Sequence, residues 1–259
     1  MLVNDGIDAN YFSELSLYQE LLLVLSERAS AELSRPNSAL ETTQVARWFG
    51  LNPPLATGAS RGEVAKTLRQ LKSTLNTVGI NVKYATLKER DRGTLGSALP
   101  PQWGNYTISG AEKLLVDTGG KFVFTANSAL LALPPINTDA NTANWGQSCF
   151  ANFIHEMTHA FLNTDDVEDN TGQSMYGPAA HLAWVANGGA KLNDRYTHAR
   201  QCSTLEVASN WGFFVEDLMT TSEREAVSAK VLASRKTGWS AKLREEANRL
   251  LGVRAPVRI

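Results

Sequence analysis

Apolar residues in the first part of the chain recur at the spacing of a helix. The positions concerned are Tyr11, Leu15, Tyr18, Leu22 and Leu25. Steps of four and three place these side chains on one face, because an α-helix has about 3.6 residues per turn. The pattern therefore predicts an amphipathic helix that turns this face to a core.

Capping signals indicate where further helices begin. Three pairs match the Ser-x-x-Glu pattern: Ser38 with Glu41, Ser60 with Glu63, and Ser222 with Glu225. In a capping box the serine hydroxyl accepts a hydrogen bond from a first-turn amide, and the glutamate reaches back to the serine amide. We expect the third helix to be a solvated one over 221–250. The first two belong to a helical N-terminal region that we place at residues 1–79.

After this helical region the pattern changes to alternation. Residues 80–87 (INVKYATL) alternate apolar and polar side chains, which predicts a half-buried strand. Residues 113–126 hold two apolar runs around the Asp-Thr-Gly-Gly sequence of 117–120, which predicts a β-hairpin. Residues 88–112 are rich in Gly, Pro and Ser and are expected to form a loop. Helices combined with a small sheet indicate the α+β class.

Composition and charge exclude several classes of protein. The chain has 259 residues, a formal net charge of −1 and 43% hydrophobic residues, as an ordinary globular protein does. The near-neutral charge provides no basic field for nucleic acid, and no apolar run approaches the roughly 20 residues of a membrane span. The first residues lack the pattern of a signal peptide, so we expect a cytoplasmic protein, or one exported by a dedicated secretion system. Two cysteines, Cys149 and Cys202, are too few for a disulfide framework and suit a reducing compartment.

The segment from 148 to 163 combines a core-facing stripe with the residues of a metal site. The apolar stripe consists of Phe150, Ile154, Met157 and Phe161. A second, polar stripe includes His155 and His159, and their i, i+4 spacing lets both imidazoles reach one ion. Glu156 lies about 100° around the helix, where its carboxylate can act as general base on a metal-bound water. This HExxH pattern indicates a catalytic zinc site.

The HExxH pattern alone does not identify the third zinc ligand. A catalytic zinc takes three protein ligands and leaves its fourth position to water. The metzincin pattern needs a glycine and a histidine where this chain has Leu162 and Asp165, and the gluzincin pattern would use a glutamate of a later helix, here Glu206. A third register uses an aspartate shortly after the second histidine. The other two histidines, His181 and His198, are expected to be structural or exposed.

Three segments within residues 148–217 carry a family pattern: HEMTHAFLNTDD, YGPAAHLAWVANGGAKL and EVASNWGFF. They resemble the aspzincin metallopeptidases, the group of deuterolysin and peptidyl-lysine endopeptidase. That family combines HExxH with a Gly-Thr-x-Asp segment, a Tyr-Gly pair and a later segment similar to Asn-Ala-Asp-Asn-Tyr. The resemblance implies that His155 and His159 are zinc ligands, that Glu156 is the base, and that Asp166 is the third ligand.

Further positions both match and depart from this family. Tyr176 with Gly177 matches the Tyr-Gly pair, so the resemblance implies a tyrosine that donates a hydrogen bond to the oxyanion of the reaction. Asn163 replaces the family glycine, and the tyrosine follows the aspartate at a longer distance than usual. Lysine-specific members carry an acidic pair where this chain has Ser209 and Gly212. Lysine specificity therefore does not carry over.

Together these observations predict a zincin-like, α+β, zinc-dependent metalloendopeptidase with one Zn²⁺ per chain and a protein or peptide substrate. Its catalytic domain would span residues 80–259 after the helical region, or form one continuous domain with it. Bacterial relatives of the family occur as toxin or effector domains, so the resemblance also implies a secretion-system or immunity protein as partner. Two alternatives stay open: a non-catalytic binding module with a relic metal site, and a gluzincin-type peptidase that uses Glu206.

Overall fold

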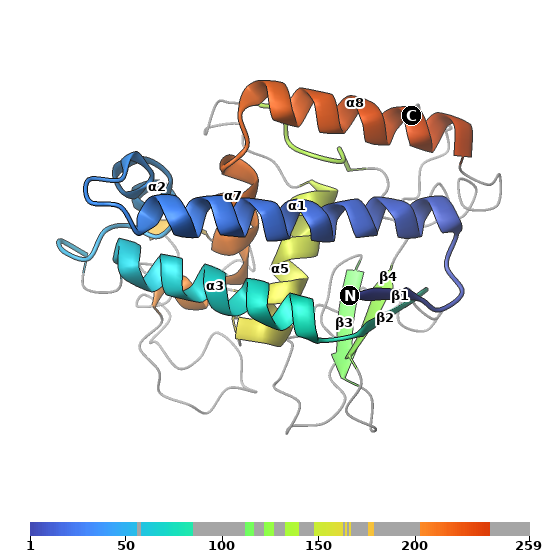
Figure 1. Ribbon diagram of the computed structural model, residues 1–259, viewed down its shortest axis with the longest axis horizontal. Helices are drawn as coiled ribbons and strands as arrows, with labels where there is room; N and C mark the ends of the chain where they lie inside the picture. The colour runs from blue at the N-terminus through green and yellow to red at the C-terminus, as the bar shows by residue number, and fades with distance from the viewer. Residues whose placement is uncertain are drawn as a thin grey trace, which may run out of the picture.

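The chain combines a helical layer with a small sheet, and this α+β class agrees with the sequence pattern. The computed structural model describes residues 1–55, 58–84, 112–116, 122–126, 133–139, 148–162, 164, 166, 176–178 and 203–238. Figure 1 shows three long helices lying side by side, with two further helices crossing behind them and the sheet at one end.

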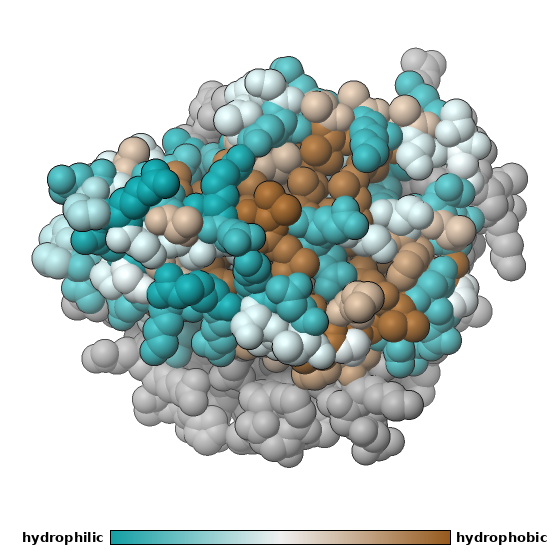
Figure 2. Space-filling view, viewed as in Figure 1, coloured by the Kyte–Doolittle hydropathy of each residue, from teal (hydrophilic) through white to brown (hydrophobic). Residues whose placement is uncertain are grey.

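The long helix α1 (Ala9–Leu33) forms the centre of the helical layer, between α3 (Arg61–Thr77) and α8 (Thr221–Gly238) (Figure 1). Asp8 caps its first turn by accepting hydrogen bonds from two amides. The predicted apolar face is confirmed, because its members are all buried: Tyr11, Leu15, Tyr18, Leu22 and Leu25. Figure 2 shows apolar side chains gathered between α1 and α8, where these two helices meet the solvent.

The capping box at Ser60 is confirmed and the one at Ser38 is wrong. Ser60 and Glu63 make both reciprocal hydrogen bonds at the beginning of α3. The chain near Ser38 instead forms a π-helical turn, η1 (Glu41–Val45), which leads into α2 (Ala46–Trp48) and has no side-chain cap. The amide of Glu41 donates to the backbone oxygen of Ser38 at 3.1 Å, and the buried hydroxyl of Ser38 donates to a carboxylate oxygen of Glu32 at 3.5 Å. The reciprocal side-chain hydrogen bonds of a capping box are therefore not formed.

The box at the third helix is displaced by two residues from its predicted place. The hydroxyl of Thr220 accepts a hydrogen bond from the amide of Glu223 at 3.2 Å, and the carboxylate of Glu223 accepts one from the amide of Thr220 at 2.7 Å. Threonine serves in this role as serine does. Ser222 is exposed within the helix itself, and the predicted residues beyond 238 lie outside the described part of the chain.

Four strands of the described residues form one sheet in the order β1-β2-β4-β3. The first strand, β1 (Leu2–Asn4), has no counterpart in the sequence prediction and pairs in parallel with β2 (Ile80–Tyr84). β2 pairs in parallel with β4 (Phe122–Ala126), which pairs in antiparallel with β3 (Glu112–Val116). The predicted strand and hairpin are thus confirmed, while the turn and the predicted loop 88–112 lie almost entirely outside the described residues.

Two further helices complete the core. They are α5 (Cys149–Leu162) and α7 (Ala208–Asp217), which follows the short 3₁₀ turn η5 (Thr204–Glu206). A single buried apolar cluster joins side chains of α1, α3, α5, α7 and the sheet, so residues from both sides of position 79 share one core. Among the helices of the described residues, none combines the length and the apolar composition that crossing a membrane requires.

Candidate metal centre

The helix that carries the two histidines is fixed at its beginning and along one side. The hydroxyl of Ser148 accepts a hydrogen bond from the amide of Ala151 at 3.0 Å, which caps the first turn of α5. Phe150, Ile154 and Met157 are fully buried in the common core, as the apolar stripe of the sequence predicts. The helix therefore holds its histidines on a rigid support.

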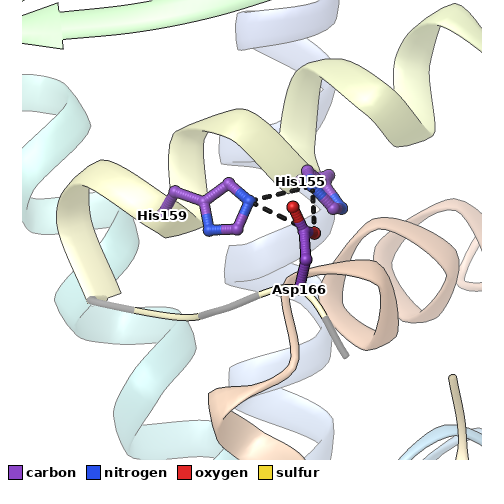
Figure 3. A group of neighbouring side chains, drawn as sticks. All are labelled: His155, His159 and Asp166. Atoms are coloured by element: carbon purple, nitrogen blue, oxygen red, sulfur yellow. Dashed lines mark hydrogen bonds and ion pairs between the residues drawn. The ribbon is translucent and has the colours of Figure 1, made fainter. Parts of the chain in front are cut away.

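Three side chains converge next to this helix: His155, His159 and Asp166 (Figure 3). The two Nε2 atoms are 2.9 Å apart, and an aspartate oxygen lies 3.0 Å from Nε2 of His155 and 3.5 Å from Nε2 of His159. Around a tetrahedral zinc with ligands at about 2.0–2.1 Å, neighbouring ligand atoms lie about 3.3 Å apart. The three atoms thus have the spacing of ligands to one ion.

Each histidine is also held through its second ring nitrogen. Nδ1 of His159 lies 2.8 Å from the backbone oxygen of Thr164, and a carbonyl can only accept, so Nδ1 carries the proton and Nε2 presents its lone pair. Nδ1 of His155 lies 3.2 Å from the hydroxyl of Ser209 at the beginning of α7. If His155 also carries its proton on Nδ1, the Nε2 lone pairs of both histidines and a carboxylate oxygen of Asp166 face one position. A cation at that position would offset the repulsion between these three groups.

Burial and charge set the protonation states of the cluster. Burial lowers the pKa of His155, although the nearby Asp166 opposes this shift. Burial alone would raise the pKa of Asp166, but the two imidazoles outweigh it and hold this pKa well below the ordinary value. A neutral imidazole and an ionised carboxylate are the forms that bind a metal. His155 and Asp166 therefore favour their metal-binding forms at neutral pH.

Glu156 and Tyr176 were the catalytic candidates of the sequence. Glu156 lies on α5 directly after the first histidine, and only 2% of it is exposed. Tyr176 is 40% exposed, and its ring packs 4.9 Å from that of Phe213 and 6.2 Å from that of Trp48 between ring centroids. Both roles, the base and the oxyanion donor, stay predictions.

Glu206, one of the alternative third ligands, does not belong to this cluster of described residues. Glu206 serves as the capping residue of η5, where its carboxylate accepts a hydrogen bond from the amide of Ser203 at 3.2 Å. Asp165, His181 and His198 lie outside the described residues. Asp166 is thus the carboxylate that the structure brings to the two histidines.

Two residues, one on α7 and one on α5, make contacts that the sequence did not reveal. Ser209 was noted only as a departure from the lysine-specific pattern, yet it contacts His155 from 54 positions away. Cys149 is buried at the beginning of α5, where Nη2 of Arg235 lies 3.2 Å from its sulfur. Cys202 lies outside the described residues. No local signal in the sequence could have found either contact.

No model of a known protein family matches this chain, and no curated protein matches its sequence.

Proposed function

We propose that this protein is a zinc-dependent metalloendopeptidase. The observation that carries the proposal is the convergence of His155, His159 and Asp166 within 4.8 Å beside a helix with the HExxH pattern. The aspzincin resemblance supports the same ligand set, and it would place the protein in a zincin-like fold. Two imidazoles and a carboxylate suit a catalytic zinc with an open position.

Each residue of the site would have a distinct role in peptide hydrolysis. When bound, zinc would make a coordinated water more acidic and polarise the substrate carbonyl. Glu156 would take a proton from that water and pass it to the leaving amine. Tyr176 would donate a hydrogen bond to the oxygen of the attacked carbonyl. Thr164 and Ser209 would keep the two imidazoles oriented through their Nδ1 atoms.

A non-catalytic module with a relic metal site is the second candidate. Structural zinc sites are closed by four protein ligands, whereas three side chains converge among the described residues here. A structural site also has no use for a base, yet Glu156 is retained beside the first ligand. Both observations favour the catalytic proposal.

Metal analysis combined with one substitution tests the proposal. Protein prepared without chelator should carry about one zinc per chain. Glu156→Gln should keep that zinc but slow the cleavage of proteins in a whole-cell lysate by about 10²–10⁴-fold, because the amide cannot accept a proton. Glu225→Gln, an exposed position on α8, is the matched control and should cleave as the parent does. A parent without zinc, or a Glu156→Gln variant as active as the parent, would contradict the proposal.

A further inference from the structure

One stripe of α7 leads away from the metal cluster. Ser209, Phe213 and Asp217 follow one another at steps of four, which places them on the same side of the helix. Ser209 contacts the ligand His155 at 3.2 Å. One turn further, the ring of Phe213 packs against that of Tyr176. The aromatic pair thus lies about one helical turn, roughly 5–6 Å, from the residue that touches the metal ligand.

Tyr176 is presented by a fixed backbone. The amide of Gly177 donates a hydrogen bond to the side-chain oxygen of Asn210 at 2.5 Å, one residue beyond Ser209. Gly177 has a φ of 66°, a left-handed conformation that glycine adopts at little cost. The partners of the tyrosine ring are buried, since Phe213 is 5% and Trp48 3% exposed, while the tyrosine itself is 40% exposed. Tyr176 thus presents the open face of an aromatic wall, and the two buried rings support it from behind.

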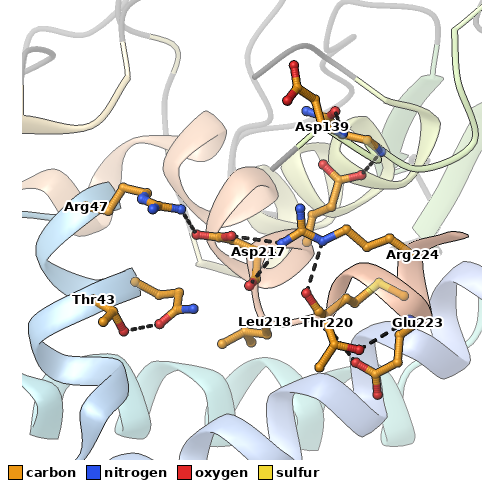
Figure 4. A network of polar contacts seen from close by, with 12 residues as sticks. Thr43, Arg47, Asp139, Asp217, Leu218, Thr220, Glu223 and Arg224 are labelled. Atoms are coloured by element: carbon orange, nitrogen blue, oxygen red, sulfur yellow. Dashed lines mark hydrogen bonds and ion pairs between the residues drawn. The ribbon is translucent and has the colours of Figure 1, made fainter. Parts of the chain in front are cut away.

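The carboxylate beside this wall already has cationic partners. Asp217 accepts from Arg47 at 2.7 Å and from Arg224 at 3.0 Å (Figure 4), and the indole nitrogen of Trp48 donates to the same carboxylate at 2.9 Å. At position 212, a Cβ would lie 2.6 Å from the backbone oxygen of Ala151. A side chain cannot be added there without moving the helices apart. Neither Asp217 nor position 212 therefore offers a carboxylate to a basic substrate side chain.

From this geometry we infer that this aromatic wall binds, through the exposed ring of Tyr176, a bulky apolar side chain of the substrate, next to the bond that is cleaved. The inference rests on the proposed function and names its substrate class. Aromatic rings bury large apolar areas and favour aromatic partners, and apolar walls with few polar groups are usual in ligand sites. A lysine side chain would lose its hydration there without gaining a carboxylate partner.

Binding of small hydroxamates tests the wall without requiring turnover. The probes are the hydroxamates of N-acetylphenylalanine, Nα-acetyllysine and N-acetylglycine, titrated calorimetrically into zinc-loaded Glu156→Gln protein. All three share the metal-binding group and differ only in the side chain. The phenylalanine probe should bind about tenfold or more tightly than the glycine probe, and the lysine probe should gain little.

Substitutions of Tyr176 test whether the preference for the phenylalanine probe comes from the aromatic wall. Tyr176→Ala should reduce the phenylalanine-over-glycine ratio by about 3–10-fold, whereas Tyr176→Phe, which keeps the ring, should preserve it. Val24→Ala, a truncation of an exposed apolar residue on α1, is the control and should change nothing. A lysine probe that binds most tightly, or a ratio unchanged by Tyr176→Ala, would overturn the inference. This assay measures binding and not cleavage. A parent protein that prefers the phenylalanine probe but cleaves no protein in the lysate assay would contradict the proposed function and leave this inference standing.

Discussion

Glu216 on α7 is a buried carboxyl whose ionisation should govern stability near neutral pH. It is fully buried, and one of its oxygens accepts hydrogen bonds from the hydroxyl of Ser148 at 2.5 Å and the amide of Asn137 at 2.7 Å. Burial raises the pKa of Glu216 to about 7 from the ordinary 4.5, although these hydrogen bonds and the nearby Arg224 oppose the shift. We predict that Glu216→Gln reduces the fall in the free energy of unfolding that accompanies rising pH.

The sign and size follow from proton linkage. In the pH window between 4.5 and about 7 the folded protein keeps a proton on Glu216 that the unfolded chain has released. The free energy of unfolding therefore falls as pH rises through this window and levels off above it. One pKa unit corresponds to about 1.36 kcal/mol. Between about pH 5 and pH 8, the loss attributable to this carboxyl amounts to roughly 2.5 kcal/mol.

Urea unfolding of the parent and Glu216→Gln at both pH values measures this contribution. Chelator is present throughout, so that metal binding does not enter the comparison. The amide oxygen can still accept from Ser148 and Asn137, but the side chain no longer titrates. The parent should lose about 2–3 kcal/mol more than the variant between the two pH values. Glu225→Gln, at an exposed position, should behave as the parent does. Equal losses in the parent and Glu216→Gln would refute the linkage argument.

Two further predictions concern the metal ligands and their support. Asp166→Asn should weaken zinc binding strongly, because a neutral amide is a much poorer ligand than a carboxylate. Glu206→Gln should leave zinc affinity within about twofold of the parent, since the Glu206 carboxylate caps η5. Competition with a chromogenic chelator measures the zinc affinity of both variants. If Glu206→Gln lost more zinc affinity than Asp166→Asn, Glu206 would be the third ligand. Ser209→Ala should lower zinc affinity by about 10–100-fold through loss of the contact to His155. In the same assay Ser209→Thr, which keeps the hydroxyl, should restore most of that affinity, and a Ser209→Ala variant with parental affinity would exclude the supporting role.

The sequence predicts those parts of the molecule that depend on neighbours along the chain. The apolar stripe of α1 and the capping box of α3 are local patterns, and both appear as predicted. The same holds for α5, where i, i+4 spacing alone brings the two histidines to one side of the helix. Asp166 follows within seven residues of the second histidine, so its approach to the cluster also needs only a short turn.

Contacts between distant segments leave no such pattern. β1 has three residues and gains its place by pairing with β2, nearly eighty positions later, so no alternation of its own could reveal it. Ser38 matches the capping box, but its hydroxyl turns toward Glu32 of the preceding helix instead. Thr220 takes the role predicted for Ser222 because the helix begins earlier. A capping pattern thus identifies candidate residues, and packing decides which of them is used.

The position of the metal cluster depends on how α5 and α7 are paired. Three contacts at successive turns join them in antiparallel register. Ser209 meets His155, position 212 meets Ala151, and Glu216 meets Ser148. Each step of three or four residues forward on α7 is matched by one backward on α5, as expected for two antiparallel helices packed along their length.

The middle contact sets the distance between the two helices. A Cβ at position 212 would lie 2.6 Å from the backbone oxygen of Ala151, so only glycine permits this close approach. The close approach, in turn, brings the hydroxyl of Ser209 within reach of His155 at one end and Glu216 within reach of Ser148 at the other. The absence of a side chain at 212 is therefore what places the hydroxyl of Ser209 against His155.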